Sequence, residues 1–253
     1  MTTVYLILFF IYGLIFGSFF NVVGSRLPNG ESIILPASHC TKCGHKLTAV
    51  ELIPVISYII QKGKCKKCGT RLPLMYPFYE LFCGIIFAIC YYRFGLTKEI
   101  IIPLTFISML LIIIVSDIEY MIIPDEVLIF FGIVLFIEIG IINGLSSLLY
   151  SILYGVASFA IMFIIKLFGD YIFKKESMGG GDIKLMFFFG LCTGLPNALF
   201  SIFIGSLVGL PLSLIVLKFK KTNIIPFGPL LSLGIMIIIL TGFDINALLN
   251  YIG

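Results

Sequence analysis

The run IIPLTFISMLLIIIVSD at residues 101–117 decides the class of fold, because it is long and apolar and ends at a carboxylate. A helix needs about 20 predominantly apolar residues to cross the hydrocarbon core of a bilayer. Runs of this kind recur along the 253-residue chain, of which 60% is hydrophobic and only 12% charged, with a mean hydropathy of +1.15. Soluble globular domains do not have such a composition. The sequence therefore predicts an all-α integral membrane protein.

Eight apolar segments are predicted as transmembrane helices. The first has no basic residue before it and exceeds the apolar core of a secretory signal peptide, so we expect it to remain in the protein as a span. The sixth is short and close to the seventh, as expected for a partial or tilted helix. The predicted spans are 4–24, 77–94, 100–116, 126–143, 146–168, 185–196, 197–217 and 224–241.

Lys and Arg residues gather on one side of this predicted topology. With the N-terminus outside, 15 of the 17 lie in or beside cytoplasmic segments, and only Arg93 and Lys98 fall on the other side. Positive charge is enriched in the cytoplasmic loops of membrane proteins. The distribution therefore supports eight spans with both termini outside. It also puts Asp117, at the end of the third span, and Asp182, at the start of the sixth, at the cytoplasmic edge.

The predicted organisation has three parts. Residues 1–24 form the first transmembrane helix, and residues 77–253 form the helical membrane core. Between them, residues 25–76 form a small cytoplasmic insertion that carries most of the charge and four of the seven cysteines. No other soluble segment of comparable length is predicted.

The four cysteines of the insertion form two C-x-x-C pairs, separated by residues 44–64. Each pair lets two thiolates reach one tetrahedral ion, and the spacing is typical of a four-cysteine zinc site. Two disulfides are an alternative, which the reducing cytoplasm disfavours, and metal-free cysteines are another. The prediction is a zinc-ribbon-like insertion with structural zinc held by Cys40, Cys43, Cys65 and Cys68.

The segment Gly179-Gly180-Gly181-Asp182-Ile183-Lys184-Leu185 places a second carboxylate among apolar residues. Such a position is costly and calls for a reason. If Asp117 and Asp182 share a site, one proton is shared between them. The ionised member can then take a proton from water while the protonated member polarises a peptide carbonyl, as in aspartic proteases. The glycines would allow close approach of a substrate and an extended backbone before Asp182.

Other roles for these acids stay open on the residues alone. Both acids could serve ion translocation, although transporters usually carry such acids near the midplane and often have inverted repeats. Asp182 could also cap a helix, and Asp117 could be an ordinary interfacial acid. Asp125 is expected to cap the fourth span, and Lys184 could pair with Asp182. A membrane-anchored zinc-binding module is a further alternative, which leaves the glycine–aspartate segment unexplained.

Several motifs in order along the chain resemble the type IV prepilin peptidases, which are membrane aspartyl proteases of the GxGD type. The resemblance covers nearly the whole chain. The matching segments are Gly13 to Val23 followed by Arg26-Leu27-Pro28, the two C-x-x-C pairs with Ile53 to Tyr58 between them, Tyr76 to Leu81, Asp117 to Asp125, and Gly179 to Leu185.

This resemblance implies a function. It identifies Asp117 and Asp182 as a catalytic pair that removes the basic leader of prepilins or pseudopilins, after a glycine, at the cytoplasmic face of the bacterial plasma membrane. It also implies N-methylation of the new N-terminus with S-adenosylmethionine as donor, an activity associated with the insertion. No residue is assigned to donor binding. The expected partners are these substrates and the lipid bilayer, with no nucleic acid.

Overall fold

The computed structural model describes residues 2–220, 226–243 and 245, and in residues 212–220 the backbone alone. Within these ranges the regular structure is helical, apart from two isolated β-bridges. The prediction of an all-α protein is therefore confirmed for the part of the chain that the structure describes. The chain divides into two compact units, Met1–Leu96 and Thr97–Gly253.

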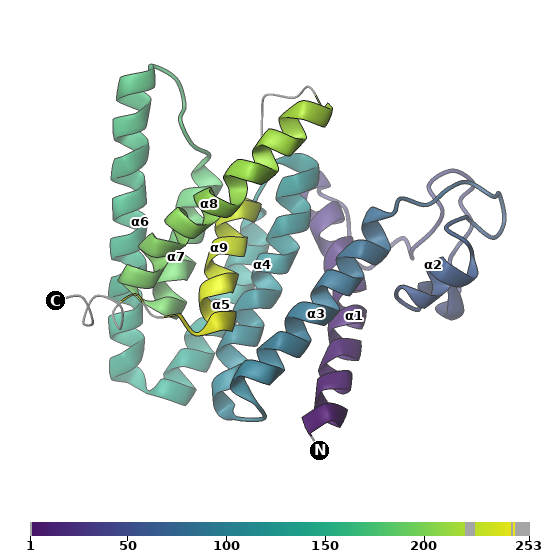
Figure 1. Cartoon of the computed structure of the whole chain (residues 1–253), viewed down its shortest axis with the longest axis horizontal. Helices are drawn as coiled ribbons and strands as arrows, with labels where there is room; N and C mark the ends of the chain where they lie inside the picture. Colours follow the sequence, from purple (N-terminus) through teal and green to yellow (C-terminus); the bar gives the residue numbers. More distant parts are fainter. Residues whose placement is uncertain (1, 221–225, 244, 246–253) are drawn as a thin grey trace. The chain divides into compact units, whose positions relative to one another are not determined.

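The first unit is built on two helices, α1 (Thr2–Arg26) and α3 (Met75–Phe94), which lie side by side (Figure 1). Glycines on α1 make this close packing possible. A Cβ atom on Gly13 would lie 2.6 Å from the carbonyl oxygen of Cys83, and one on Gly17 would lie 2.7 Å from the Cβ atom of Cys83. Small residues at this four-residue spacing let membrane helices approach backbone to backbone.

The insertion between α1 and α3 contains only short helices: η1 (Leu27–Asn29), η2 (Ala49–Leu52) and α2 (Ile56–Ile60). A carboxylate of α3 ties it to the helix pair. Glu80 Oε2 accepts a hydrogen bond of 2.7 Å from the backbone N–H of Val55, a residue held at a φ of 61°. Glu80 therefore has a structural partner within this unit and stabilises an uncommon backbone conformation.

The second unit contains η3 (Lys98–Ile100) and six helices: α4 (Ile101–Tyr120), α5 (Asp125–Asn143), α6 (Leu145–Phe173), α7 (Gly180–Thr193), α8 (Leu195–Lys220) and α9 (Gly228–Thr241). The short helix α7 contacts α4, α6, α8 and α9 (Figure 1). Residues 106–117 of α4 are all buried. The core of this unit is thus formed around α4 and α7, the helices that carry the two predicted catalytic aspartates.

Each of the eight predicted spans overlaps with one of the helices α1 and α3 to α9. The sixth span extends past the end of α7, and residues 224 and 225 of the last span lie outside the described residues. Within the described residues, four segments are long and apolar enough to cross a membrane: Thr2–Asn29, Met75–Phe94, Lys98–Tyr120 and Leu145–Phe173. For the other four, the crossing stays a prediction. The 14-residue α7 is only about 21 Å long at 1.5 Å per residue, which is shorter than the hydrocarbon core.

The predicted division at residues 24 and 76 concerns membrane placement and stays a prediction. The compact units have a different boundary, because α3 packs on α1 and belongs with the insertion.

Replacement of Gly13 by alanine should weaken the α1–α3 pair. The added methyl group would meet backbone atoms of α3, which cannot rotate away, so we expect a loss of about 1–3 kcal/mol in unfolding free energy. Thermal unfolding in detergent measures it. Gly140→Ala on α5 is the matched control, because a Cβ there meets only Leu148 Cδ2 at 3.5 Å. Equal melting temperatures for the two variants would contradict the proposed packing.

Candidate functional site

Asp117 lies in the last turn of α4 and is only 7% exposed. The helix ends just beyond it at Met121, which has a left-handed φ of 56° and donates its N–H to the carbonyl of Asp117 at 3.0 Å. Pro124 then starts a new direction, because the residue before a proline disfavours helical conformation. The carboxyl group is thereby held at a helix end, beside the loop formed by residues 121–124.

Asp182 lies in the first turn of α7 and is 8% exposed. The N-cap of this helix is Gly179, without a side-chain capping bond, so the alternative that Asp182 caps the helix is wrong. The expectation of an extended backbone is also wrong for Gly180 and Gly181, which form the first helical turn. The carboxyl group of Asp182 is therefore free of a capping role.

The structure brings Asp117 and Asp182 together. Their charges lie within electrostatic range of one another. A Cβ atom on Gly181 would come within 3.0 Å of Ile123 Cβ, so the glycine lets α7 approach the loop that follows Asp117. Among the acidic residues that the structure describes, these two alone are buried. Two buried acids that interact electrostatically are compatible with a carboxylate pair, and their catalytic role stays a prediction.

A third segment, which was not predicted from the sequence, also reaches Asp117. The backbone N–H of Gly228, at the start of α9, donates a buried hydrogen bond of 3.1 Å to Asp117 Oδ2. The pattern Pro226-Phe227-Gly228-Pro229 before an apolar run was the available signal, since it marks a turn into a helix. It carries no titratable group and so did not suggest chemistry.

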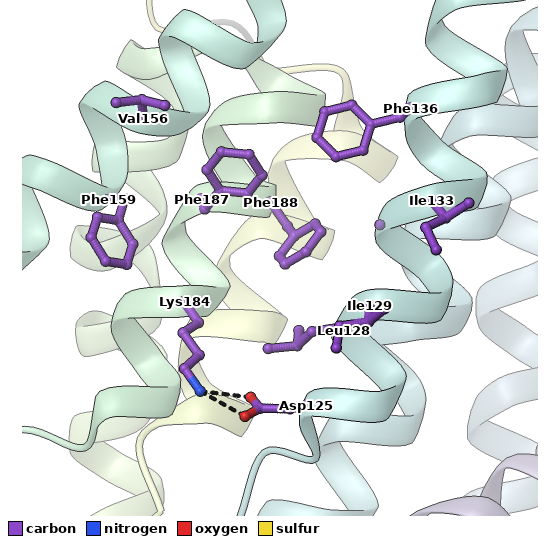
Figure 2. A pocket seen from close by; sticks show the side chains of 11 residues that line it. Asp125, Leu128, Ile129, Ile133, Phe136, Val156, Phe159, Lys184, Phe187 and Phe188 are labelled. Atoms are coloured by element: carbon purple, nitrogen blue, oxygen red, sulfur yellow. Dashed lines mark hydrogen bonds and ion pairs between the residues drawn. The ribbon is translucent and has the colours of Figure 1, made fainter.

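An apolar groove of about 620 Å³ lies between α5, α6 and α7 (Figure 2). It is lined by aromatic and aliphatic side chains, among them Phe136, Phe159, Phe187 and Phe188, and neither Asp117 nor Asp182 belongs to the lining. Lys184 lines the groove and follows Asp182 by two residues, which on a helix is a rotation of about 200°. The groove therefore lies on the other side of α7 from the carboxyl pair.

Lys184 pairs with Asp125 at one end of this groove, as Figure 2 shows. The ammonium group lies 2.6 and 2.9 Å from the two carboxylate oxygens. The possible pairing of Lys184 with Asp182 is therefore wrong, because the partner of Lys184 is Asp125. Asp125 is the first residue of α5, after the N-cap Pro124, and it makes no side-chain capping bond.

The four cysteines of the insertion converge on one point. Their Sγ atoms all lie within 4.8 Å of one another. The distances are 3.8 Å between the Sγ atoms of Cys40 and Cys68 and 3.9 Å between those of Cys43 and Cys65. These are far longer than the 2.05 Å of a disulfide, and all seven cysteines of the chain are free. The predicted clustering is confirmed, and the disulfide alternative is not supported.

The two C-x-x-C turns are built alike, and they affect their thiols unequally. Gly44 and Gly69 follow them in the left-handed region, at φ values of 67° and 71°. Hydrogen bonds with Thr70 lower the pKa of Cys68 to about 6. Cys43 is the opposite case: contact with the backbone of His45 lowers its pKa, but burial and the neighbouring thiols outweigh this and raise it to about 11. Crowded thiols cannot all ionise cheaply without a cation.

Comparison with known proteins accounts for both units. Residues 11–94 match the bacterial peptidase A24 N-terminal domain, and residues 104–214 match the type IV leader peptidase family. A protein of Bacillus subtilis named prepilin leader peptidase/N-methyltransferase is 38% identical over 93% of this chain and 94% of its own length. The chain belongs to the type IV leader peptidase family.

Other members of the family carry the same name. The relative from Stutzerimonas stutzeri is 29% identical over 94% of this chain and 91% of its own, and that from Pseudomonas aeruginosa is 29% identical over 92% and 89%. No solved structure matches the chain. The family resemblance inferred from the motifs is confirmed.

Because Lys184 pairs with Asp125, replacement of either residue should lower the unfolding free energy by a similar, small amount. The two side chains are 50% and 59% exposed, and exposed ion pairs contribute at most about 1 kcal/mol. Lys184→Met and Asp125→Asn should each lower the unfolding free energy by no more than this, and the double variant by no more than either single one. Thermal unfolding in detergent measures the three. A loss in Lys184→Met that Asp125→Asn does not share would point to another partner for the lysine.

Proposed function

We propose that this protein cleaves the leader peptide from prepilins or pseudopilins, with Asp117 and Asp182 as the catalytic pair. Membership of the type IV leader peptidase family supports the reaction class. The observation that carries the residue assignment is burial: Asp117 and Asp182, as whole residues, are only 7% and 8% exposed, less than any other acidic residue that the structure describes.

The pair is suited to hydrolysis by activation of water. Two neighbouring carboxyl groups in an apolar site hold one proton between them. The ionised group accepts a proton from water as the water oxygen bonds to the peptide carbonyl carbon, while the protonated group donates to the carbonyl oxygen. The C–N bond then breaks, and the amine leaves with a proton returned by the pair. No covalent bond between substrate and protein is needed.

The distribution of charge indicates the side of the membrane at which cleavage occurs. A prepilin presents a basic leader followed by an apolar helix, so its scissile bond lies at the membrane surface. The distribution of Lys and Arg favours the cytoplasmic side for Asp117 and Asp182. We infer that cleavage occurs at the cytoplasmic face of the bacterial plasma membrane.

Cleavage of a prepilin by purified protein tests the assignment. Asp117→Asn and Asp182→Asn should each lower kcat by at least about 100-fold, because each removes one partner of the proton transfer. Products are followed by mass spectrometry. Asp125→Asn is the matched control, an exposed acid near Asp117 in sequence, and should cleave at the normal rate. Near-normal cleavage by either buried-acid variant would contradict the pair, and lack of cleavage by the unmodified protein would contradict the function.

We further propose that the insertion holds structural zinc and serves N-methylation of the new N-terminus with S-adenosylmethionine. With Zn–S distances of about 2.3 Å, a tetrahedron of sulfurs has edges of about 3.8 Å. The distances of 3.8 and 3.9 Å between Sγ atoms fit this geometry. Cys40, Cys43, Cys65 and Cys68 would hold the ion, which would supply structural cross-linking of two loops and no reaction step.

The zinc proposal predicts that methylation depends on the metal and that cleavage does not. The protein should contain about one zinc per chain by metal analysis, and the double variant Cys43→Ser/Cys68→Ser much less, because two of four thiolates are gone. His39→Gln, next to the first pair of cysteines, is the control and should keep its zinc.

With a pilin cleaved beforehand, the cysteine variant should fail to add a methyl group, whereas Asp182→Asn should add it normally. On intact prepilin, the cysteine variant should still cleave. Methylation by a zinc-free variant would contradict the role of the metal, and loss of methylation in Asp182→Asn would contradict the separation of the activities.

A further inference from the structure

The amino end of α9 makes a buried contact with one member of the carboxyl pair. Gly228 N–H donates to Asp117 Oδ2 at 3.1 Å, across 111 positions of sequence. Residue 228 lies beyond residues 104–214, the range that matches the type IV leader peptidase family. No equivalent hydrogen bond reaches the carboxyl group of Asp182 from the residues that the structure describes. The pair is therefore asymmetric.

In the first turn of α9, only the N–H of Gly228 is available to bind a group outside the helix. Pro229 has no N–H, and the N–H groups of Leu230 and Leu231 both bond to the carbonyl of Phe227. The first N–H groups of a helix lack intrahelical partners and carry its positive dipole end. A donor of this kind stabilises a carboxylate in preference to a carboxylic acid.

The space around Gly228 excludes any side chain. A Cβ atom there would lie 2.6 Å from Asp117 Oδ2 and 3.4 Å from Ile123 Cδ1. Ile123 also lies close to Gly181 of α7, where an added Cβ atom would be 3.0 Å from Ile123 Cβ. Only glycine at position 228 lets the backbone come within hydrogen-bond distance of the carboxyl group. Ile123 lies beside both Gly228 and Gly181, so the loop after Asp117 contacts the starts of α7 and α9.

The helix α9 is closely packed against α8. A Cβ on Gly205 would lie 2.7 Å from the carbonyl of Leu230, and one on Gly234 would lie 2.5 Å from the carbonyl of Ser201. These are backbone contacts, which cannot be relieved by a change of rotamer. The close packing of the two helices thus helps to fix the position of the Gly228 N–H.

We propose that Gly228 is a positioning residue of the active site, which fixes Asp117 and keeps it as the ionised member of the pair. This proposal rests on the proposed function. It assigns Asp117 as the group that accepts the proton of water and Asp182 as the group that donates to the carbonyl oxygen. The segment Phe227–Pro229 becomes a third part of the site, although it has no titratable side chain.

Gly228→Ala tests the proposal through the pH profile of cleavage. The added methyl group displaces Asp117 from the N–H, so kcat should fall by about 100-fold, as misplacement by about 1 Å can do, with KM little changed. Loss of the hydrogen bond to Asp117 should also move the acid limb of the kcat/KM profile, which a purely structural defect would leave in place. Gly140→Ala on α5, where the added Cβ makes only an ordinary contact of 3.5 Å with Leu148 Cδ2, is the control and should leave rate and profile unchanged.

A second experiment separates positioning from misfolding. In the Asp117→Asn background, Gly228→Ala should cause no further loss of cleavage, because it acts through Asp117. Thermal unfolding of Gly228→Ala in detergent should stay cooperative, which verifies folding of the second unit. An unshifted acid limb in Gly228→Ala, or a further loss in the double variant, would overturn the proposal. These outcomes differ from failure of the proposed function, in which the unmodified protein does not cleave prepilin or Asp117→Asn cleaves normally.

Discussion

Two carboxyl groups withdrawn from solvent at neighbouring helix ends are the constraint on which the second unit depends. Burial of a charge is costly unless the charge is shared or hydrogen-bonded. Here α4 ends at Asp117 and α7 begins beside Asp182, so both groups reach the same region without interrupting an apolar helix. The glycines at 181 and 228 allow the remaining backbone to close around them. The arrangement satisfies the chemistry of a shared proton with little departure from helical structure.

The first unit follows a different physical rule. Its helices pack through glycines. Its insertion consists of short turns around the cysteines and has very little apolar core. Glu80 links the two by binding the backbone of Val55. A cross-linking metal would suit this unit, since small loop-rich domains rarely bury enough apolar surface to fold unaided. The separation into two compact units matches the separation of two proposed activities.

Much of this architecture could be predicted from sequence because its signals are local. Apolar runs of helical length located the helices, and the C-x-x-C spacing predicted the cluster of four thiols. Asp117 and Asp182 were identified because a charge in an apolar run is conspicuous. Gly228 could not be found in this way, since its contribution is a backbone N–H and the absence of a Cβ. The partner of Lys184 was also beyond sequence reasoning, because helical rotation turns it away from Asp182 and toward Asp125.

We propose that Asp117 and Asp182 act as one unit on the same peptide bond. The affinity for a prepilin peptide with a hydroxyl-bearing, non-cleavable mimic of the tetrahedral intermediate tests it most directly. Each Asp→Asn variant should lose the extra affinity that such a mimic gains over a plain non-cleavable peptide, and the double variant should lose no more than either single one. Losses that add in the double variant, or a single variant with unmodified affinity, would contradict the claim.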